Sequence, residues 1–185
     1  MKNVEVEIQA RIKNPKDAEK KILKFGKFVK SRQQKDIYFV TPQKNFFAKY
    51  MPDEYLRIRY EQDKNHLNYS FLHFKKNGWL NATDEYETLV AKPEVVEMIF
   101  KKIGLIPKVT VIKTRKYFDC DNFEVTLDNI KGLGNFMEVE AKKLFGTVAQ
   151  TRKKCEDFIN SLGIKYEVSK EAGYPRMLYQ KLHKK

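Results

Sequence analysis

The segment Val125–Ala141 constrains the fold of this chain more than any other stretch. It reads V-T-L-D-N-I-K-G-L-G-N-F-M-E-V-E-A, so that two runs of alternating polar and apolar residues flank a Gly-Leu-Gly turn. Successive side chains of a strand point to opposite faces, and glycine gives the backbone the freedom to reverse its direction. The segment therefore predicts a β-hairpin with Asp128, Glu138 and Glu140 on one face and apolar side chains on the other.

Three carboxylates on one face of a hairpin have two explanations. In the simpler one they point into solvent, as acidic side chains usually do. In the other they bind a cation, because like charges this close repel each other unless a positive ion lies between them. The same pattern at Glu5 and Glu7, and again at Glu85 and Glu87, favours a cation site.

Basic residues alternate in the same way on other predicted strands. Arg57 and Arg59 share one strand face, and Lys113 and Arg115 share another. Two arginines at this spacing can bind one anion at two points. An ordinary solvated face is the alternative for each pair taken alone.

Composition limits the class of protein. The chain has 185 residues, 42% of them hydrophobic, and we expect a single domain with a core over about 1–165 and a tail over 166–185. Lys and Arg number 37 against 24 Asp and Glu, and the formal net charge of +13 favours an anionic partner. Two cysteines are too few for a disulfide framework. No signal-type or membrane-length apolar run is present, so we expect a cytoplasmic protein without a membrane partner.

Helical periodicity is confined to three segments. We expect helices beginning at Pro15, spanning Pro93–Ile103, and running from Thr147 to Leu162. The chain after Tyr166 lacks such a pattern, and its Gly-Tyr-Pro sequence at 173–175 predicts a break in any helix.

The faces of the strands suggest how the elements pack together. If the apolar faces pack against the helices, the charged faces must look the other way. A closed antiparallel barrel of about eight strands would direct them into its lumen. Such a lumen needs an anion for its bases and a cation for its carboxylates, and a metal–polyphosphate complex supplies both. An open α+β sheet with a mixed-charge surface is the alternative.

Several segments carry a resemblance, in the same order as in a known family. They are E-V-E-I-Q at 5–9, L-R-I-R at 56–59, Lys75 after an aromatic strand, K-T-R at 113–115, L-D-N-I-K-G-L-G-N-F at 127–136 and the final E-V-E. This series, over residues 1–145, resembles the CYTH superfamily of triphosphate tunnel enzymes: class IV adenylate cyclases, thiamine triphosphatases and inorganic triphosphatases. The stretch K-D-I-Y-F-V-T-P at 35–42 is most similar to the cyclase branch.

The resemblance implies an α+β fold: a closed antiparallel eight-stranded β-barrel tunnel with flanking α-helices. It implies that the tunnel binds a triphosphate with Mg²⁺ or Mn²⁺. The implied metal ligands are Glu5, Glu7, Asp128, Glu138 and Glu140. The implied substrate-binding residues are Arg57, Arg59, Lys75, Lys113 and Arg115, and the implied catalytic residues are Glu85, Glu87 and Lys113.

Two positions depart from the pattern of the family. Gln9 stands where the family has lysine, and Thr83 stands where a basic residue is usual. Arg11 lies on the same strand face as Gln9, and we therefore include it among the predicted substrate-binding residues.

The expected function is a class IV adenylate cyclase-like reaction that converts ATP to cyclic AMP and pyrophosphate. A triphosphatase acting on thiamine triphosphate, tripolyphosphate or nucleoside triphosphates is the first alternative. A non-catalytic polyphosphate- or RNA-binding module is the second, suggested by the net charge and by Phe46, Phe47 and Tyr50 near lysines. We expect a small triphosphate as partner and no dedicated nucleic-acid partner, and we leave a homodimer open.

Overall fold

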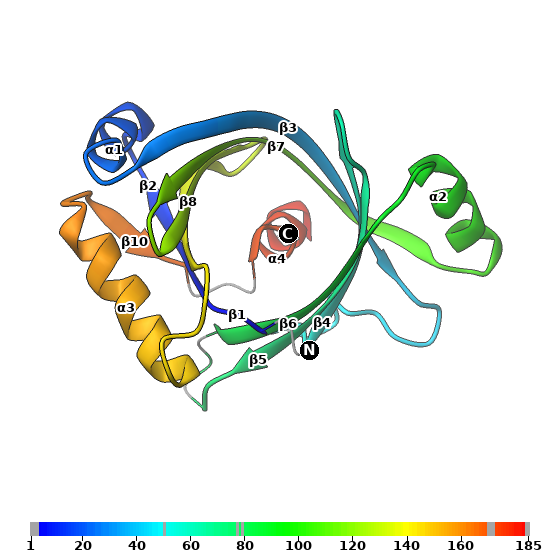
Figure 1. Cartoon of the computed structure of the whole chain (residues 1–185). Helices are drawn as coiled ribbons and strands as arrows, with labels where there is room; N and C mark the ends of the chain where they lie inside the picture. The colour runs from blue at the N-terminus through cyan, green and yellow to red at the C-terminus, as the bar shows by residue number, and fades with distance from the viewer. Residues whose placement is uncertain (1–3, 50, 77, 79, 170–172, 184–185) are drawn as a thin grey trace.

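The computed structural model describes residues 4–49, 51–76, 78, 80–169 and 173–183. Within these residues the protein has an α+β fold, with one strongly curled antiparallel sheet of ten strands and four helices (Figure 1). The strand order along the sheet is β1-β6-β5-β4-β3-β7-β8-β9-β2-β10.

The strands are β1 (Val4–Glu5), β2 (Glu7–Ile12), β3 (Lys27–Val40), β4 (Glu54–Glu61), β5 (His66–Phe74), β6 (Leu80–Leu89), β7 (Ile106–Cys120), β8 (Phe123–Ile130), β9 (Gly134–Ala141) and β10 (Tyr166–Val168). The helices are α1 (Pro15–Ile22), α2 (Pro93–Lys102), α3 (Val148–Ser161) and α4 (Gly173–His183).

The curl of the sheet follows from the first strand segments. Val6 alone separates β1 from β2, yet β1 pairs with β6 and β2 pairs with β9, which lies far along the strand order. Because one residue spans so little, the sheet must bend until these strands approach each other. The predicted antiparallel, curled sheet is confirmed. The predicted closed ring of eight strands is not what the described residues form: the first strand is split at Val6, β10 adds to β2, and the order ends at β1 and β10.

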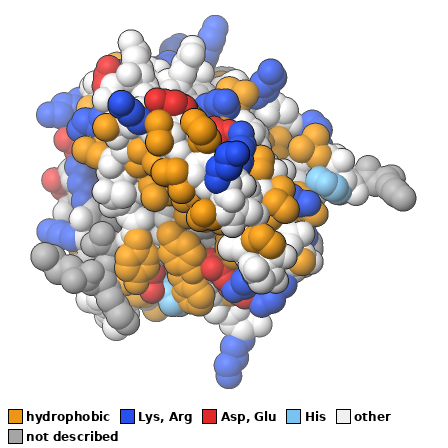
Figure 2. Space-filling model, turned by 90° about the vertical axis from the view of Figure 1, so that its right-hand side faces the viewer, with side chains coloured by type: hydrophobic (Ala, Val, Ile, Leu, Met, Phe, Trp, Pro, Cys, Tyr) orange, Lys and Arg blue, Asp and Glu red, His pale blue; other side chains and the backbone are white. Residues whose placement is uncertain are grey.

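Helices cover the outer face of the sheet on two sides (Figure 1), where apolar residues of the strands pack against them. The helices α1 and α3 pack on one side against a cluster that includes Ile8, Val125 and Met137. The helix α3 starts with a capping box in which the Thr147 side chain accepts from the backbone N–H of Gln150, as predicted. On the other side, which faces the viewer in Figure 2, α2 packs against β3 and β4.

The helix α4 lies inside the curl of the sheet (Figure 1). It begins at Gly173, so the residues 173–175 that were predicted to break a helix form its first turn. Pro175 is tolerated because the backbone N–H groups of the first helical turn have no acceptor within the helix. A proline there loses no helical hydrogen bond. Tyr174, Met177 and Leu178 are buried against inward-facing residues of the sheet, including Phe136. The inner face of the sheet is therefore apolar beside α4 and charged elsewhere.

Two of the aromatic residues that suggested a binding module, Phe46 and Phe47, lie between β3 and β4 and pack against α4. Phe46 and Phe47 are buried, and the Phe47 ring stacks on Tyr179 with 5.0 Å between centroids. Arg176 Nη1 donates to the Phe47 carbonyl oxygen at 2.9 Å. Tyr50, the third aromatic residue of that prediction, lies outside the described residues. Among the described helices, none has the length and apolarity that crossing a membrane requires.

Candidate functional site

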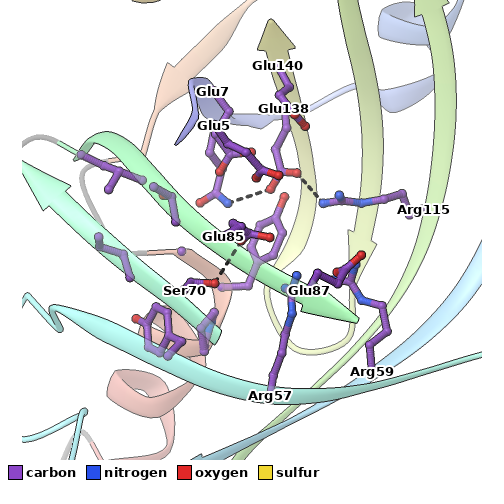
Figure 3. A pocket seen from close by; sticks show the side chains of 18 of the residues that line it. Glu5, Glu7, Arg57, Arg59, Ser70, Glu85, Glu87, Arg115, Glu138 and Glu140 are labelled. Atoms are coloured by element: carbon purple, nitrogen blue, oxygen red, sulfur yellow. Dashed lines mark hydrogen bonds and ion pairs between the residues drawn. The ribbon is translucent and has the colours of Figure 1, made fainter. Parts of the chain in front are cut away.

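A cavity of about 550 Å³ lies on the charged part of the inner face. Figure 3 shows glutamates on one side of it and Arg57 and Arg59 on the other. Ten of the thirteen predicted site residues line it: Glu5, Glu7, Arg57, Arg59, Glu85, Glu87, Lys113, Arg115, Glu138 and Glu140. Alternation along the strands accounts for this result, because each pair two residues apart projects to the same face.

The register between β2 and β9 places acidic side chains of the two strands next to each other. Glu7 is directly opposite Glu140, and Gln9 is opposite Glu138, in the β2–β9 ladder. Directly opposed residues of an antiparallel pair have Cβ atoms about 5 Å apart, so like charges there destabilise each other. The hairpin and the first strand thus form one continuous acidic wall.

Three glutamates of this wall lack a compensating charge in direct contact. Glu5, Glu7 and Glu140 make no hydrogen bond or ion pair with another described side chain. Burial, together with the charges of Glu85 and Glu140, raises the pKa of Glu5 to about 8. Burial and the nearby charge of Glu138 raise the pKa of Glu7 well above its usual value. Burial and neighbouring carboxylates raise the pKa of Glu140 to about 7.

These carboxylates suit a bound divalent cation. Carboxylate oxygens are the donors that Mg²⁺ and Mn²⁺ prefer, and a cation would remove the repulsion that raises the pKa of each group. Among the described residues, no three Asp, Glu, His or Cys side chains are gathered in the arrangement of a formed metal site. Glu5, Glu7 and Glu140 thus have the donor chemistry that a divalent cation prefers, but they are not gathered into a formed site.

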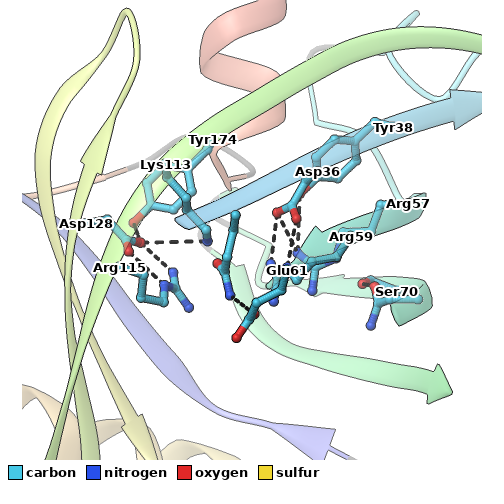
Figure 4. A network of polar contacts seen from close by, with 12 residues as sticks. Asp36, Tyr38, Arg57, Arg59, Glu61, Ser70, Lys113, Arg115, Asp128 and Tyr174 are labelled. Carbon is cyan, nitrogen blue, oxygen red and sulfur yellow. Dashed lines mark hydrogen bonds and ion pairs between the residues drawn. The ribbon is translucent and has the colours of Figure 1, made fainter. Parts of the chain in front are cut away.

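The arginines of β4 are held by a buried carboxylate that the sequence analysis did not assign to the site. Arg59 makes a bidentate ion pair with Asp36, with Nε–Oδ1 at 2.7 Å and Nη2–Oδ2 at 2.9 Å (Figure 4). Arg57 Nη1 lies 3.7 Å from Asp36 Oδ2 and donates to the Tyr38 hydroxyl at 3.3 Å. Burial opposes the ionised form of Asp36, but the charge and hydrogen bonds of Arg59 outweigh it and lower the pKa of Asp36 below its usual range.

A second buried network holds Arg115. Its guanidinium donates to Asp128 through Nε at 2.7 Å and also forms an ion pair with Glu138. Burial disfavours both carboxylates in ionised form, but the charge of Arg115 outweighs it and lowers the pKa of each. Asp128 lies behind Arg115 and does not line the cavity. In this structure Asp128 and Glu138 therefore position an arginine, whereas the sequence predicted both as metal ligands.

Lys113 joins the two networks. Its Nζ lies 3.9 Å from Asp128 Oδ2, and the side chain is almost wholly buried. Burial, followed by the charge of Arg115, lowers the pKa of Lys113 to about 8. This lysine is thus a cation whose charge is easily lost, and a bound anion beside it would favour the protonated form.

Tyr174 of α4 completes this side of the cavity. Its hydroxyl donates to Asp128 Oδ2 at 2.9 Å, and Lys113 Nζ lies 5.3 Å from the centre of its ring. Burial, together with the charge of Glu138, raises the pKa of Tyr174 well above its usual value, so the hydroxyl keeps its proton. The C-terminal helix therefore contacts the buried ion pairs directly.

The central glutamates sit between the acidic and basic sides. Glu85 accepts from Asn68 Nδ2 at 2.8 Å and from the Ser70 hydroxyl at 3.0 Å. Glu87 pairs with His66 at 2.9 Å and is partly exposed. Glu85 is therefore held by neutral donors of β5, and its charge acts on the neighbouring Arg57.

Gln9 also lines the cavity, beside the acidic wall. Its Nε2 donates to Glu138 Oε1 at 2.9 Å. Its Oε1 is buried and has no hydrogen-bond partner among the described residues. The residue thus supplies one neutral donor where the family pattern has a charged one.

Two predicted substrate-binding residues lie outside the cavity. Arg11 is exposed; its guanidinium carbon lies 4.5 Å from the centre of the Phe136 ring, and its Nη1 donates to the Leu133 carbonyl oxygen at 2.7 Å. Lys75, which follows β5, is exposed and lines a separate pocket together with Arg152 and Glu156 of α3. The structure thus does not bring Arg11 and Lys75 together with the other predicted substrate-binding residues.

Several residues of the site were missed by the sequence analysis: Asp36, Tyr38, Asn68, Ser70 and Tyr174. Asp36 and Tyr38 had a detectable signal, since they alternate with apolar Ile37 and Phe39 on β3. The role of Asp36 depends on strand register, which places it opposite Arg59. No local sequence pattern marks Tyr174 as a site residue, because only the tertiary fold brings α4 next to the cavity.

Comparison with known proteins agrees with this architecture. The CYTH domain family model matches residues 3–174. A Methanocaldococcus jannaschii protein named “putative adenylate cyclase” is 29% identical over 160 residues, covering 86% of this chain and 87% of the relative.

Solved structures share the fold. A protein of Pyrococcus horikoshii OT3 is 23% identical and superposes with a TM-score of 0.82, covering 96% of this chain and 99% of the other. A Hippeastrum protein, described as a “putative adenylyl cyclase” with a dominant triphosphatase activity, is 16% identical with a TM-score of 0.66, covering 96% and 95% of the two chains.

Proposed function

The chain belongs to the CYTH family, and from this premise we propose that it is a divalent-metal-dependent enzyme that converts ATP to cyclic AMP and pyrophosphate in the central cavity. Enzymes of this family act on triphosphates and generally depend on divalent metals. One observation carries the proposal. Arg57, Arg59, Lys113 and Arg115 line the same cavity as the unpaired carboxylates of Glu5, Glu7 and Glu140.

The two sides of the cavity suit the two parts of a metal–triphosphate complex. Guanidinium groups bind phosphate oxygens through paired donors, and the ion pairs with Asp36 and Asp128 hold Arg59 and Arg115 in fixed orientations. Glu5, Glu7 and Glu140 would hold the cation. Such an ion supplies charge neutralisation at the phosphate oxygens and a lowered pKa for a bound hydroxyl.

The protein groups would act mainly by binding and orientation. In the cyclase reaction the ribose 3′-oxygen forms a bond to the α-phosphorus, the bond from that phosphorus to the bridging oxygen breaks, and pyrophosphate and one proton leave. Lys113 and Arg115 would stabilise the charge that moves onto the leaving pyrophosphate. Glu85, fixed by Ser70 and Asn68, would keep its carboxylate between the phosphate side and the metal side.

The name of a relative favours a nucleotide over a bare polyphosphate. The protein at 29% identity is named “putative adenylate cyclase”.

Hydrolysis of a triphosphate is the second candidate, and a specific observation supports it. Tyr38, Tyr55 and Leu72 belong to the apolar cluster that packs against α4, and each is more than nine-tenths buried. Little of their surface is left for a base, whereas a linear tripolyphosphate needs none. Water would then form a bond to the γ-phosphorus, and the bond from that phosphorus to the bridging oxygen would break. The shortened phosphate chain would leave, and orthophosphate and one proton would be released.

Product analysis separates the candidates. The protein is incubated with ATP, thiamine triphosphate or tripolyphosphate, each with Mg²⁺ or Mn²⁺, and products are resolved by chromatography. We expect cyclic AMP and pyrophosphate from ATP, with loss of turnover in EDTA and in the Glu140→Gln variant. Orthophosphate as the main product would establish the hydrolase instead. Absence of any metal-dependent product would contradict both and favour a binding module.

A further inference from the structure

The helix α2 is apolar on two sides. Its inner side carries Val96 and Phe100, which pack against Ile37, Phe39 and Ile58 of the sheet. A helix that covers a sheet normally turns a polar face to solvent. In α2 this polar face is interrupted by a second apolar stripe.

The second stripe consists of Val95, Met98, Ile99 and Ile103. Met98 is 56% exposed, Ile99 51% and Ile103 65%, although all are large apolar side chains. Figure 2 shows apolar side chains gathered on this face of the molecule, with charged groups among and around them. A contiguous exposed patch of this kind, rimmed by charge, marks an interaction surface.

The charges along α2 indicate which partner fits. Glu94 and Lys102 are exposed and make no hydrogen bond or ion pair with any described residue. Glu97, by contrast, already binds Lys101 Nζ at 2.6 Å and the Tyr60 hydroxyl at 2.7 Å. Within Pro93–Lys102 as the structure describes it, α2 therefore offers one spare acid near its start and one spare base at its end.

The spacing of the spare charges is symmetric about Met98. Glu94 lies four residues before Met98 and Lys102 lies four residues after it, so the three lie on one stripe of the helix. If a second copy of this helix packs against it in the antiparallel direction, each acid meets a base and the apolar centres meet each other. An isologous interface with two-fold symmetry requires such a surface.

We propose that α2 is the dimerisation surface of this protein, and that it packs antiparallel against α2 of a second copy with the two-fold axis at Met98. Glu94 then faces Lys102 of the partner subunit, and Lys102 faces Glu94 of the partner subunit. The two apolar stripes bury each other between these ion pairs. Antiparallel packing also places each helix N-terminus beside the C-terminus of the other, where the helix dipoles attract. This surface is separate from the cavity, so the proposal stands independently of the proposed function.

Sedimentation analysis of the full chain over about 1 to 100 µM tests the proposal, since weak interfaces dissociate in this range. We expect a concentration-dependent monomer–dimer equilibrium. Met98→Glu should abolish the dimer, because it places two like charges at the axis. The matched control is Val29→Glu, since Val29 is an equally exposed apolar residue near the start of β3, far from α2 (Figure 1). It should leave the equilibrium unchanged.

Charge reversal tests the antiparallel register without altering the apolar stripe. Glu94→Lys and Lys102→Glu should each weaken the dimer by about tenfold, because each turns two ion pairs into repulsive contacts. The double reversal should recover affinity to within about threefold of the original protein, on the same scale of ion-pair energies. A monomer at every concentration would overturn the proposal, as would a dimer that Met98→Glu leaves intact. A double reversal no better than the single ones would refute the register.

Discussion

Among single residues, the unpaired glutamates control how the cavity responds to pH. Glu5 and Glu140 have pKa values raised to about 8 and about 7 by burial and by neighbouring carboxylates. In the unfolded chain both carboxyl groups would titrate near the ordinary value of 4.5. At pH values between the unfolded and the folded pKa, the folded protein binds more protons than the unfolded chain. The free energy of unfolding therefore falls as pH rises.

The metal-free protein should therefore lose stability progressively as pH rises from about 5 to about 8, the interval between the unfolded and folded pKa values. Urea unfolding in EDTA measures this slope. Glu5→Gln should flatten it, and Mg²⁺ or Mn²⁺ should stabilise the protein most at the alkaline end, where the carboxylates are ionised. The control is Glu167→Gln, an exposed glutamate of β10, which should keep the slope. Stability that rises with pH in EDTA over this interval would contradict the assignment.

Tyr174 links the C-terminal helix to the arginine that is expected to bind phosphate. Tyr174→Phe removes the hydroxyl that donates to Asp128 at 2.9 Å and should cost about 1.5–3 kcal/mol of stability, as expected for a hydrogen bond to a charged group. Arg115 should then be less firmly held, and tripolyphosphate affinity should fall severalfold. Urea unfolding and calorimetric titration measure the two effects. Tyr179→Phe on the same helix is the control, and equal effects of both variants would rule out the role of the hydroxyl.

Gln9 tests whether the cavity lacks a positive charge. Gln9→Lys places an ammonium group beside Glu138 and should tighten tripolyphosphate binding by about 1–2 kcal/mol, the difference between charged and neutral hydrogen bonds. Arg11→Ala should leave binding unchanged, because Arg11 lies outside the cavity and packs on Phe136. A strong loss of affinity in Arg11→Ala would mean that the natural protein uses this arginine after all. Calorimetric titration of tripolyphosphate into both variants distinguishes these outcomes.

Among the elements, α4 is the one that the sequence did not predict. Its apolar residues make sense only when the curled sheet surrounds them, and that environment comes from strands far away in the chain. Strands were easier to predict, because alternation is a local signal. It placed Glu5, Arg57 and Glu138 correctly on the inner face without any knowledge of strand order.

Partners across strands were beyond sequence reasoning. Asp36 meets Arg59, and Asp128 meets Arg115, because the strand register puts each pair side by side. The same register places Asp128, which was predicted as a metal ligand, beside Arg115. The assignment of Lys75 rested on resemblance alone, and in the structure Lys75 is exposed outside the cavity.

The packing of α4 can be tested within the helix itself. Leu178 is buried against the inner face of the sheet, and Leu178→Ala should destabilise the protein by about 2–4 kcal/mol. Leu182 is 71% exposed on the same helix, and Leu182→Ala should change stability by less than about 0.5 kcal/mol. Urea unfolding of both variants gives the comparison. Equal and small effects would mean that α4 does not occupy the interior of the sheet.

For the molecule as a whole, ligand binding depends more on how charge is distributed than on the net charge. The formal net charge is +13, yet seven carboxylates and only four basic side chains line the cavity within the described residues. The basic surface attracts an anion, while the acidic wall would repel it unless a cation accompanies it. This contrast explains why we expect triphosphate and divalent metal to bind together.

The most direct test of the account is a calorimetric titration of tripolyphosphate into three proteins, with Mn²⁺ present and again in EDTA. They are the natural protein, Arg57→Ala inside the cavity and Lys75→Ala outside it. We predict metal-dependent binding to the natural protein, binding weakened by about 10–100-fold in Arg57→Ala because a buried charged contact is lost, and unchanged binding in Lys75→Ala. Equal binding in EDTA, or a loss in Lys75→Ala as large as that in Arg57→Ala, would contradict a triphosphate site in this cavity.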